Sequence, residues 1–216
     1  MEAKRRETNV RDMTNGKPMK LILGFSLPLL LGNLFQQFYT LVDTMIVGRT
    51  LGKYALAGVG STGSITFLIV GFCMGICGGF AIPISQRFGA KDYANLRRYF
   101  FNAIVLSAAV TLALTVAVSL LCRQILVAMH TPEDVLSYAY TYLLVIFVGM
   151  PVTVFYNLLA SVIRALGDSR HPVVFLVVAS FVNIGLDLLF ILRFGMGVAG
   201  AAWATVASQT VSAILI

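Results

Sequence analysis

The chain has 216 residues, of which 58% are hydrophobic and only 12% are charged, and its mean hydropathy is +0.88. Soluble domains are about 45–50% apolar and about 25% charged, so this composition excludes an ordinary soluble protein and indicates a lipid bilayer as the solvent. The net charge of +7 does not indicate nucleic acid as a partner, because the Lys and Arg residues lie between long apolar runs instead of gathering on one solvated face. The sequence contains no Walker loop, zinc-ligand spacing or dinucleotide-binding glycine motif, so we expect neither an enzyme nor a cofactor.

Six apolar runs follow a basic tail at residues 1–18, which we expect to be cytoplasmic. A membrane-spanning helix needs about 20 largely apolar residues. The first run is longer than the roughly 7–15 apolar residues of a cleavable signal sequence, so we expect it to stay in the membrane as a helix. The sequence therefore predicts an all-α membrane protein with helices at about 19–47, 55–87, 95–122, 134–164, 173–193 and 197–216.

The basic residues are divided unevenly between the two sides that six alternating spans would define. Twelve of the 16 Lys and Arg residues fall on the side of the tail, and four fall on the other: Arg49, Lys53, Arg123 and Arg193. Cytoplasmic loops of membrane proteins carry an excess of Lys and Arg. This asymmetry predicts that both termini are cytoplasmic, in a plasma membrane such as the bacterial inner membrane.

Small residues in the second span predict close helix packing. Gly71, Gly75 and Gly79 repeat every four residues, which would form a groove for another helix backbone. Cys73 and Cys77 lie in the same apolar run, and we interpret them as packing residues rather than metal ligands.

Asp43 and Asp187 are the acidic residues that fall inside predicted spans. A carboxylate at membrane depth costs several kcal/mol, on the order of 2.5–3.5 by insertion scales, unless it is paired, hydrated or protonated. Each lies six residues before an Arg at the outer end of its helix, and Thr205 lies eight residues into the last span. At about 1.5 Å per residue, all three lie roughly 9–12 Å below the outer surface.

Polar neighbours lie close to these three residues on the expected helix faces. Asn183 precedes Asp187 by one turn, and the others are Gln36, Tyr39 and Gln209. Converging carboxylate, amide and hydroxyl oxygens suit Na⁺ or a proton shared by the two acids. The alternative is that Asp43 pairs with Arg49 and Asp187 with Arg193. Pro28 should kink the first span, either as architecture or as a moving hinge.

Five segments carry a resemblance to a known family. They are LVDTMIVGRTLGKYALAGVG at 41–60, ISQRFGAKD at 84–92, IRALGDSRHP at 163–172, VNIGLDLLF at 182–190 and GVAGAAWATVASQ at 197–209. The sequence resembles the multidrug and toxic compound extrusion (MATE) family of the MOP superfamily, and more particularly its DinF-like branch. The resemblance implies one six-helix lobe of a twelve-helix transporter that expels organic cations or amphipathic drugs in exchange for Na⁺ or H⁺.

The resemblance also implies roles for individual residues. Asp43, Asn183, Asp187 and Thr205 would hold the coupling cation, with Gln36 in the same cavity, and Pro28 matches a proline implicated in bending. The carboxy-terminal six-helix lobe would be a missing partner, so we expect a fragment of a longer transporter or a half-transporter that must pair.

Two other functions are compatible with six spans. A lipid-linked saccharide flippase of the same superfamily is disfavoured, because every Lys and Arg maps to a loop or a helix end, which leaves no cavity charge for a pyrophosphate. A channel or non-transporting subunit is the second alternative. A channel would need a polar stripe along a whole helix, whereas the polar residues singled out above are expected to stop in the outer half.

Overall fold

The computed structural model describes residues 18–216, so the predicted cytoplasmic tail lies outside the described residues except for its last position. Six helices occupy the described part, which confirms the predicted all-α fold with six spans. Each is long and apolar enough to cross a membrane. They are α1 (Pro18–Leu51), α2 (Lys53–Gly89), α3 (Tyr93–Ala128), α4 (Glu133–Ala165), α5 (Arg170–Leu188), which continues into the π-helical turn η1 (Leu189–Arg193), and α6 (Gly197–Leu215).

Two predicted helix ends were wrong because the chain breaks later than expected. The first helix passes through Gly48 and ends at Leu51, where Gly52 adopts a φ of 85°, a left-handed conformation that most residues avoid. Arg49 lies in the last turn, where a positive charge suits the helix dipole. The third helix likewise continues past residue 122 to Ala128.

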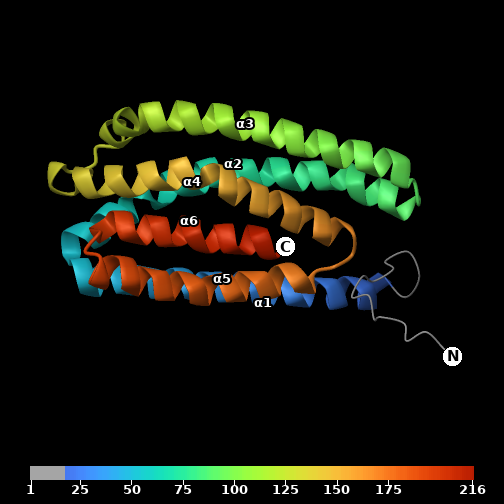
Figure 1. Cartoon of the computed structure of the whole chain (residues 1–216), viewed down its shortest axis with the longest axis horizontal. Coiled ribbons are helices and arrows are strands. Elements are labelled where there is room, and N and C mark those ends of the chain that lie inside the picture. Colours follow the sequence, from blue (N-terminus) through green and yellow to red (C-terminus); the bar gives the residue numbers. More distant parts are fainter. Residues whose placement is uncertain (1–17) are drawn as a thin grey trace.

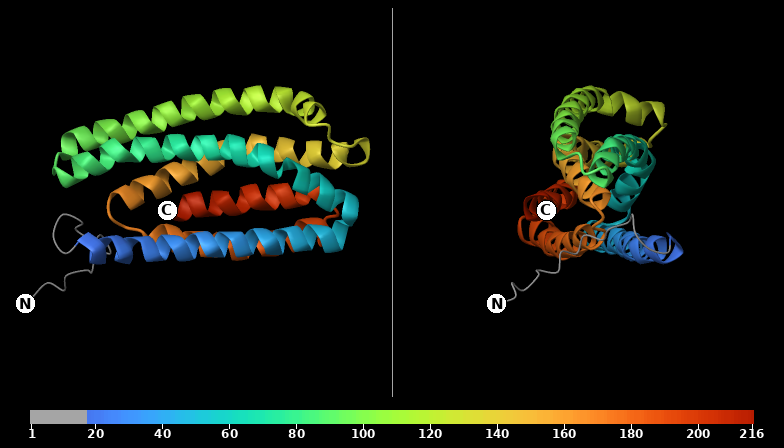
Figure 2. Two further views of the ribbon diagram at one scale, coloured as in Figure 1. Left: turned by 180° about the vertical axis from the view of Figure 1, so that it is seen from behind. Right: turned by 90° about the vertical axis from the view of Figure 1, so that its right-hand side faces the viewer.

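The helices run alternately in opposite directions and form two groups of three (Figure 1). Helices α2, α3 and α4 pack together in one group, and α1, α5 and α6 form the other. The two groups are joined by packing of α4 on α6 and of α1 on α2, and Figure 2 shows the same division from behind and end-on. This arrangement places α1, α5 and α6, the three helices that carry the predicted cation ligands, in one group.

The larger apolar core lies within the α2, α3 and α4 group. Its fully buried side chains include Ile84, Leu126, Leu143 and Phe147. Many other large apolar side chains are exposed, such as Phe67 at 82%. A bilayer solvates such side chains, so the exposed apolar surface agrees with the membrane assignment.

The glycines of α2 do not pack as predicted. A Cβ atom added at Gly71, Gly75 or Gly79 would meet nothing within 4 Å, so no described backbone enters the expected groove. Close approach occurs instead at Gly58, where an added Cβ would lie 2.7 Å from Tyr138 Cβ of α4. Sequence spacing identified a face of small residues, but tertiary packing decides whether another helix fills it.

The cysteines of α2 do pack as predicted. Cys73 and Cys77 are buried, and the Cys77 thiol donates a weak hydrogen bond to the Val154 carbonyl of α4 at 3.7 Å. Both therefore act as small residues at the α2–α4 contact.

Candidate functional site

Asp43 and Asp187 meet inside the α1, α5 and α6 group. Asp43 comes from α1 and is 7% exposed, while Asp187 lies near the end of α5 and is fully buried. Their carboxyl groups lie close enough to interact electrostatically. The structure thus brings together the two acids that the sequence analysis predicted to lie at the same depth in the membrane.

Neither acid forms the ion pair considered as the alternative. Within residues 18–216 the only ion pairs are Arg87–Asp92 and Asp168–His171, so Asp43 does not pair with Arg49. Asp187 does not pair with Arg193 either, and both arginines are exposed. Two interfacial salt bridges therefore do not account for the acids.

Several buried oxygens at this point have no hydrogen-bond partner among the described residues. They are Asp43 Oδ1, both carboxylate oxygens of Asp187, and Asn183 Oδ1. Unsatisfied buried polar atoms are rare in native proteins and each calls for an explanation. Four such oxygens gathered in one place fit a hard cation such as Na⁺, or protons shared between the acids.

Asn183 and Thr205 complete the group from two neighbouring helices. Asn183 is fully buried one turn before Asp187, and its amide nitrogen donates to Thr205 Oγ1 at 3.4 Å. Thr205 in turn donates to the Ala201 carbonyl of its own helix at 3.1 Å. These bonds use one amide N–H of Asn183 and the hydroxyl hydrogen of Thr205, so the Asn183 amide oxygen and a remaining lone pair of Thr205 Oγ1 can face a cation.

Two tyrosines border the acids. Tyr39 lies one turn before Asp43 on α1. Tyr142 of α4 packs against a small apolar cluster that includes Val47, Ile191 and Ala201, which lie one turn from Asp43, Asp187 and Thr205 respectively. The sequence analysis did not select Tyr142. Nothing in its spacing could have done so, because it reaches this cluster from the other group of helices through the packing of α4 on α6.

An inner cavity of about 170 Å³ adjoins the acid pair and includes Tyr39 in its lining. Gln36 and Gln209, the other predicted cavity residues, also line it, and Gln209 accepts a hydrogen bond from the Thr153 hydroxyl. Further polar side chains from three helices line the same cavity: Asn157, Ser180, Ser208 and Ser212.

Arg164 also lines this cavity and lies in the last turn of α4, at the end of the bundle that holds the α4–α5 connection. Polar side chains that the sequence analysis did not single out therefore extend the lining to this end of the bundle. The inference that no Lys or Arg reaches a cavity was wrong. The helix end was located correctly, but α4 leans toward α5 and α6 there and brings the side chain inside the lobe.

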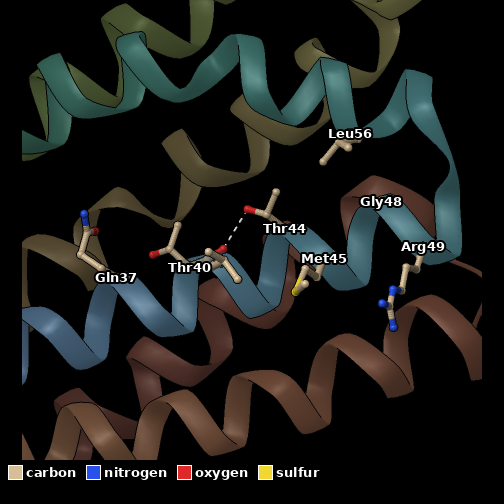
Figure 3. A pocket seen from close by; sticks show the side chains of 8 residues that line it. Gln37, Thr40, Thr44, Met45, Gly48, Arg49 and Leu56 are labelled. Atoms are coloured by element: carbon tan, nitrogen blue, oxygen red, sulfur yellow. Dashed lines mark hydrogen bonds between the residues drawn. The ribbon is translucent and has the colours of Figure 1, made fainter.

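A second hollow lies along another face of α1, toward α2 (Figure 3). Its hydroxyl groups are satisfied locally, because Thr40 donates to the Gln36 carbonyl at 2.9 Å and Thr44 to the Thr40 carbonyl at 2.8 Å. The remaining lining is largely apolar, with Met45 and Leu56 drawn in the same view. This hollow contains none of the predicted cation ligands.

Pro28 lies in the first half of α1, which stays helical on both sides of it. The proline is half-buried. Its role as a hinge stays a prediction.

A sequence model of the MatE family matches residues 28–189, which is most of the described chain and includes Asp43, Asn183 and Asp187. The chain belongs to the MatE family. Its members are membrane transporters rather than enzymes, in agreement with the sequence analysis. The predicted membership of the MATE family is confirmed.

Two relatives align with most of this chain but with less than half of their own length. The chain is 33% identical over 201 residues to "Probable multidrug resistance protein YpnP" of Bacillus subtilis, covering 93% of this chain and 45% of that protein. It is 36% identical over 196 residues to "Probable multidrug resistance protein YoeA" of the same organism, covering 89% of this chain and 42% of that protein.

A solved structure shows the same fold. It is described as an outward-facing conformation of a multidrug resistance MATE family transporter of the MOP superfamily, and it aligns with a TM-score of 0.86 at 28% identity. The alignment covers 93% of this chain and 44% of that one. This MatE chain therefore has the fold of one lobe, and it spans about half the length of the proteins that it matches.

Proposed function

We propose that this MatE chain forms the amino-terminal lobe of a secondary transporter that exports cationic or amphipathic compounds in exchange for Na⁺ or H⁺. The coupling cation would bind Asp43, Asn183, Asp187 and Thr205. The observation that carries the proposal is the group of buried oxygens without partners at the acid pair. The names of the two Bacillus relatives, both multidrug resistance proteins, support the export of drugs.

The chemistry of the site follows from two buried carboxylates that lie close enough to interact electrostatically. Two negative charges held so close repel each other strongly in a medium of low dielectric constant. A Na⁺ ion or a proton between them offsets that repulsion, and the oxygens of Asn183 and Thr205 would supply further ligands for Na⁺. Binding of the cation would thus change the charge of a contact between α1 and α5.

A change in the contact between α1 and α5 would move α1, and this movement would link cation binding to transport. Changing the charge between Asp43 and Asp187 would alter how tightly α1 packs on α5, and Pro28 lies fifteen residues before Asp43 on the same helix. Proline removes one helical hydrogen bond and is a common site of bending. We therefore assign Pro28 the role of a hinge, and Gln36, Tyr39 and Gln209 the lining of the cavity that bending would reshape.

Export requires alternating access, in which one half of a transporter rocks against the other. A second six-helix lobe would supply that other half. The excess of basic residues at the end of the bundle that holds the α2–α3 and α4–α5 connections supports cytoplasmic termini. The proposal places the acid pair in the outer half of a bacterial inner membrane.

Direct binding tests the cation site without requiring transport. We expect the purified chain in lipid nanodiscs to bind radioactive Na⁺, and Asp187→Asn to abolish that binding while leaving helix content unchanged. Asp134→Asn changes an exposed acid in the first turn of α4 and is the matched control. Equal Na⁺ binding by Asp187→Asn and the wild type would refute the proposed site.

A further inference from the structure

Arg164 offers hydrogen-bond donors that the described chain does not use. Its guanidinium carries five N–H groups. Within residues 18–216, its side chain makes one hydrogen bond, from Nη2 to Ser161 Oγ at 2.9 Å. The side chain is half-buried and lines the inner cavity. The remaining donors are therefore available to a group in that cavity.

The charge of Arg164 is also not neutralised by the described residues. Asp168 lies four residues further on, but its carboxylate accepts the backbone N–H groups of Arg170 and His171 and contacts the His171 ring. Neither of the two ion pairs among residues 18–216 includes Arg164. A half-buried cation without a counter-charge attracts an anion.

The rest of the cavity is suited to an amphipathic molecule. Asn157 and Tyr156 line the cavity together with Arg164, and the Tyr156 hydroxyl donates to the Pro172 carbonyl at 3.4 Å. Apolar side chains from three helices line other parts of the cavity: Leu29 from α1, Val70 and Met74 from α2, and Val173 and Leu176 from α5. Such a lining accommodates an apolar body beside one charged group.

The two charged ends of the lobe lie far enough apart to act separately. Pro172, beside Arg164, and Asp187 are fifteen residues apart along α5, which corresponds to about 22 Å. An acidic group held at Arg164 would therefore not lie against the acid pair. The lobe thus presents a negative site in its outer half and a positive site at its inner end.

We infer that the inner cavity is an anion subsite in which Arg164 binds the carboxylate or phosphate of an amphipathic compound. The guanidinium presents two parallel N–H groups, a geometry that matches both acids. The compound is either a soluble organic acid or zwitterion, or an anionic phospholipid of the inner leaflet. This subsite goes beyond the proposed cation exchange and does not depend on it.

The test compares naphthoate with its neutral analogue naphthamide. Binding of each is measured to the purified chain in phosphatidylcholine nanodiscs, with protein-free discs subtracted. We expect naphthoate to bind about tenfold more tightly than naphthamide, the difference that one charge-assisted contact provides. Arg164→Gln should abolish this preference. Persistence of the preference in Arg164→Gln, or its absence in the wild type, would overturn the inference.

Three controls keep the result interpretable. Arg170→Gln removes an exposed charge at the same end of the bundle that does not line the cavity, and it should leave the preference intact. Asp187→Asn should abolish Na⁺ binding but retain the preference for naphthoate, so failure of the cation site and of the anion subsite can be told apart. If Arg164→Gln does not fold, Arg164→Lys carries the test. It should keep the preference with weaker binding, and a complete loss of preference would count against the subsite.

The lipid composition of the discs distinguishes the two sources of the anion. Replacing part of the phosphatidylcholine with phosphatidylglycerol should weaken naphthoate binding by the wild type if the headgroup of an anionic lipid occupies the site. Unchanged naphthoate binding identifies a soluble anion as the ligand. In either case, the preference for naphthoate over naphthamide must disappear in Arg164→Gln.

Discussion

Tyr39 connects the two parts of the site, because it lies one helical turn before Asp43 on α1 while its side chain lines the inner cavity. No other residue of the predicted set occupies both places. An event at the acids that moves α1 would therefore also change the cavity wall. The relationship makes Tyr39 the first position at which coupling between cation and cargo can be tested.

Tyr39→Phe should weaken coupling without destroying the cation site. The substitution keeps the ring in the cavity wall and removes only the hydroxyl group, and a typical hydrogen bond of such a group is worth about 0.5–1.5 kcal/mol. We expect Na⁺ affinity to fall by no more than about tenfold, whereas Asp187→Asn abolishes binding. Radioactive Na⁺ binding to both variants measures the difference. Complete loss of binding in Tyr39→Phe would show that the hydroxyl is itself an essential ligand.

Packing between the two groups of helices should be sensitive at Gly149. A Cβ atom added there would overlap the Val206 side chain of α6, so Gly149→Ala should destabilise the chain by about 1–3 kcal/mol. Gly71→Ala is the matched control, because a Cβ at Gly71 meets nothing within 4 Å. Thermal unfolding in detergent compares the two, and adding Val206→Ala to Gly149→Ala should restore part of the lost stability. An equal loss in both glycine variants would contradict the packing shown here.

Asp168 should stabilise the start of α5 in a pH-dependent way. Burial alone would raise its pKa, but hydrogen bonds from the His171 side chain and from the backbone N–H groups of His171 and Arg170 outweigh burial and hold the pKa below its ordinary value. The stabilisation is therefore present above the pKa of the unfolded chain, and it is lost as the pH falls through the lower, folded pKa.

Asp168→Ala should remove this stabilisation, at a cost of about 0.5–2 kcal/mol typical of a lost helix cap. Thermal unfolding at neutral pH and at successively lower pH provides the measurement. The gap between the wild type and Asp168→Ala should close as the pH falls. A gap that is constant with pH would mean that the carboxylate charge contributes nothing. Asp134→Asn, at an exposed position, serves as the control.

The orientation of the lobe can be tested at the α2–α3 connection. Ala90 lies in that connection, at the end of the bundle where the basic residues are in excess. A single cysteine at Ala90, in a chain whose three native cysteines are replaced, should resist a membrane-impermeant reagent in intact cells and react after lysis. A cysteine at Thr50, an exposed position in the last turn of α1 beside the α1–α2 connection, should react in intact cells. The opposite pattern would reverse the topology.

The six spans and the two buried acids could be predicted from the sequence, but the packing of the helices against one another could not. Hydropathy located six spans because each must cross the same apolar thickness, and the cost of a charge in lipid singled out Asp43 and Asp187. Tyr142 and Arg164 escaped prediction for a common reason. Each reaches the site through the tilt and contacts of α4, which helical periodicity does not encode. The glycine face of α2 shows the converse, since a packing pattern was visible but no described helix fills it.

The strongest test of the acid pair is competition between Na⁺ and protons. If one cation offsets the repulsion between Asp43 and Asp187, Na⁺ and H⁺ must compete for the same oxygens. Na⁺ can enter only as the shared proton leaves, so by linkage Na⁺ affinity should increase with pH and then level off once the proton is gone. The titration belongs to the pair and not to either residue alone.

The measurement is Na⁺ affinity of the purified chain across about pH 5–8, a range in which an isolated exposed aspartate stays ionised. Asp43→Asn provides the comparison, because it leaves one carboxylate and so removes the repulsion that retains the proton. We expect the wild type to show a steep rise in affinity, and Asp43→Asn to bind Na⁺ weakly with little dependence on pH. If the affinity of the wild type is flat over this range, the two acids do not share a cation, and the pair acts only as a buried contact between α1 and α5.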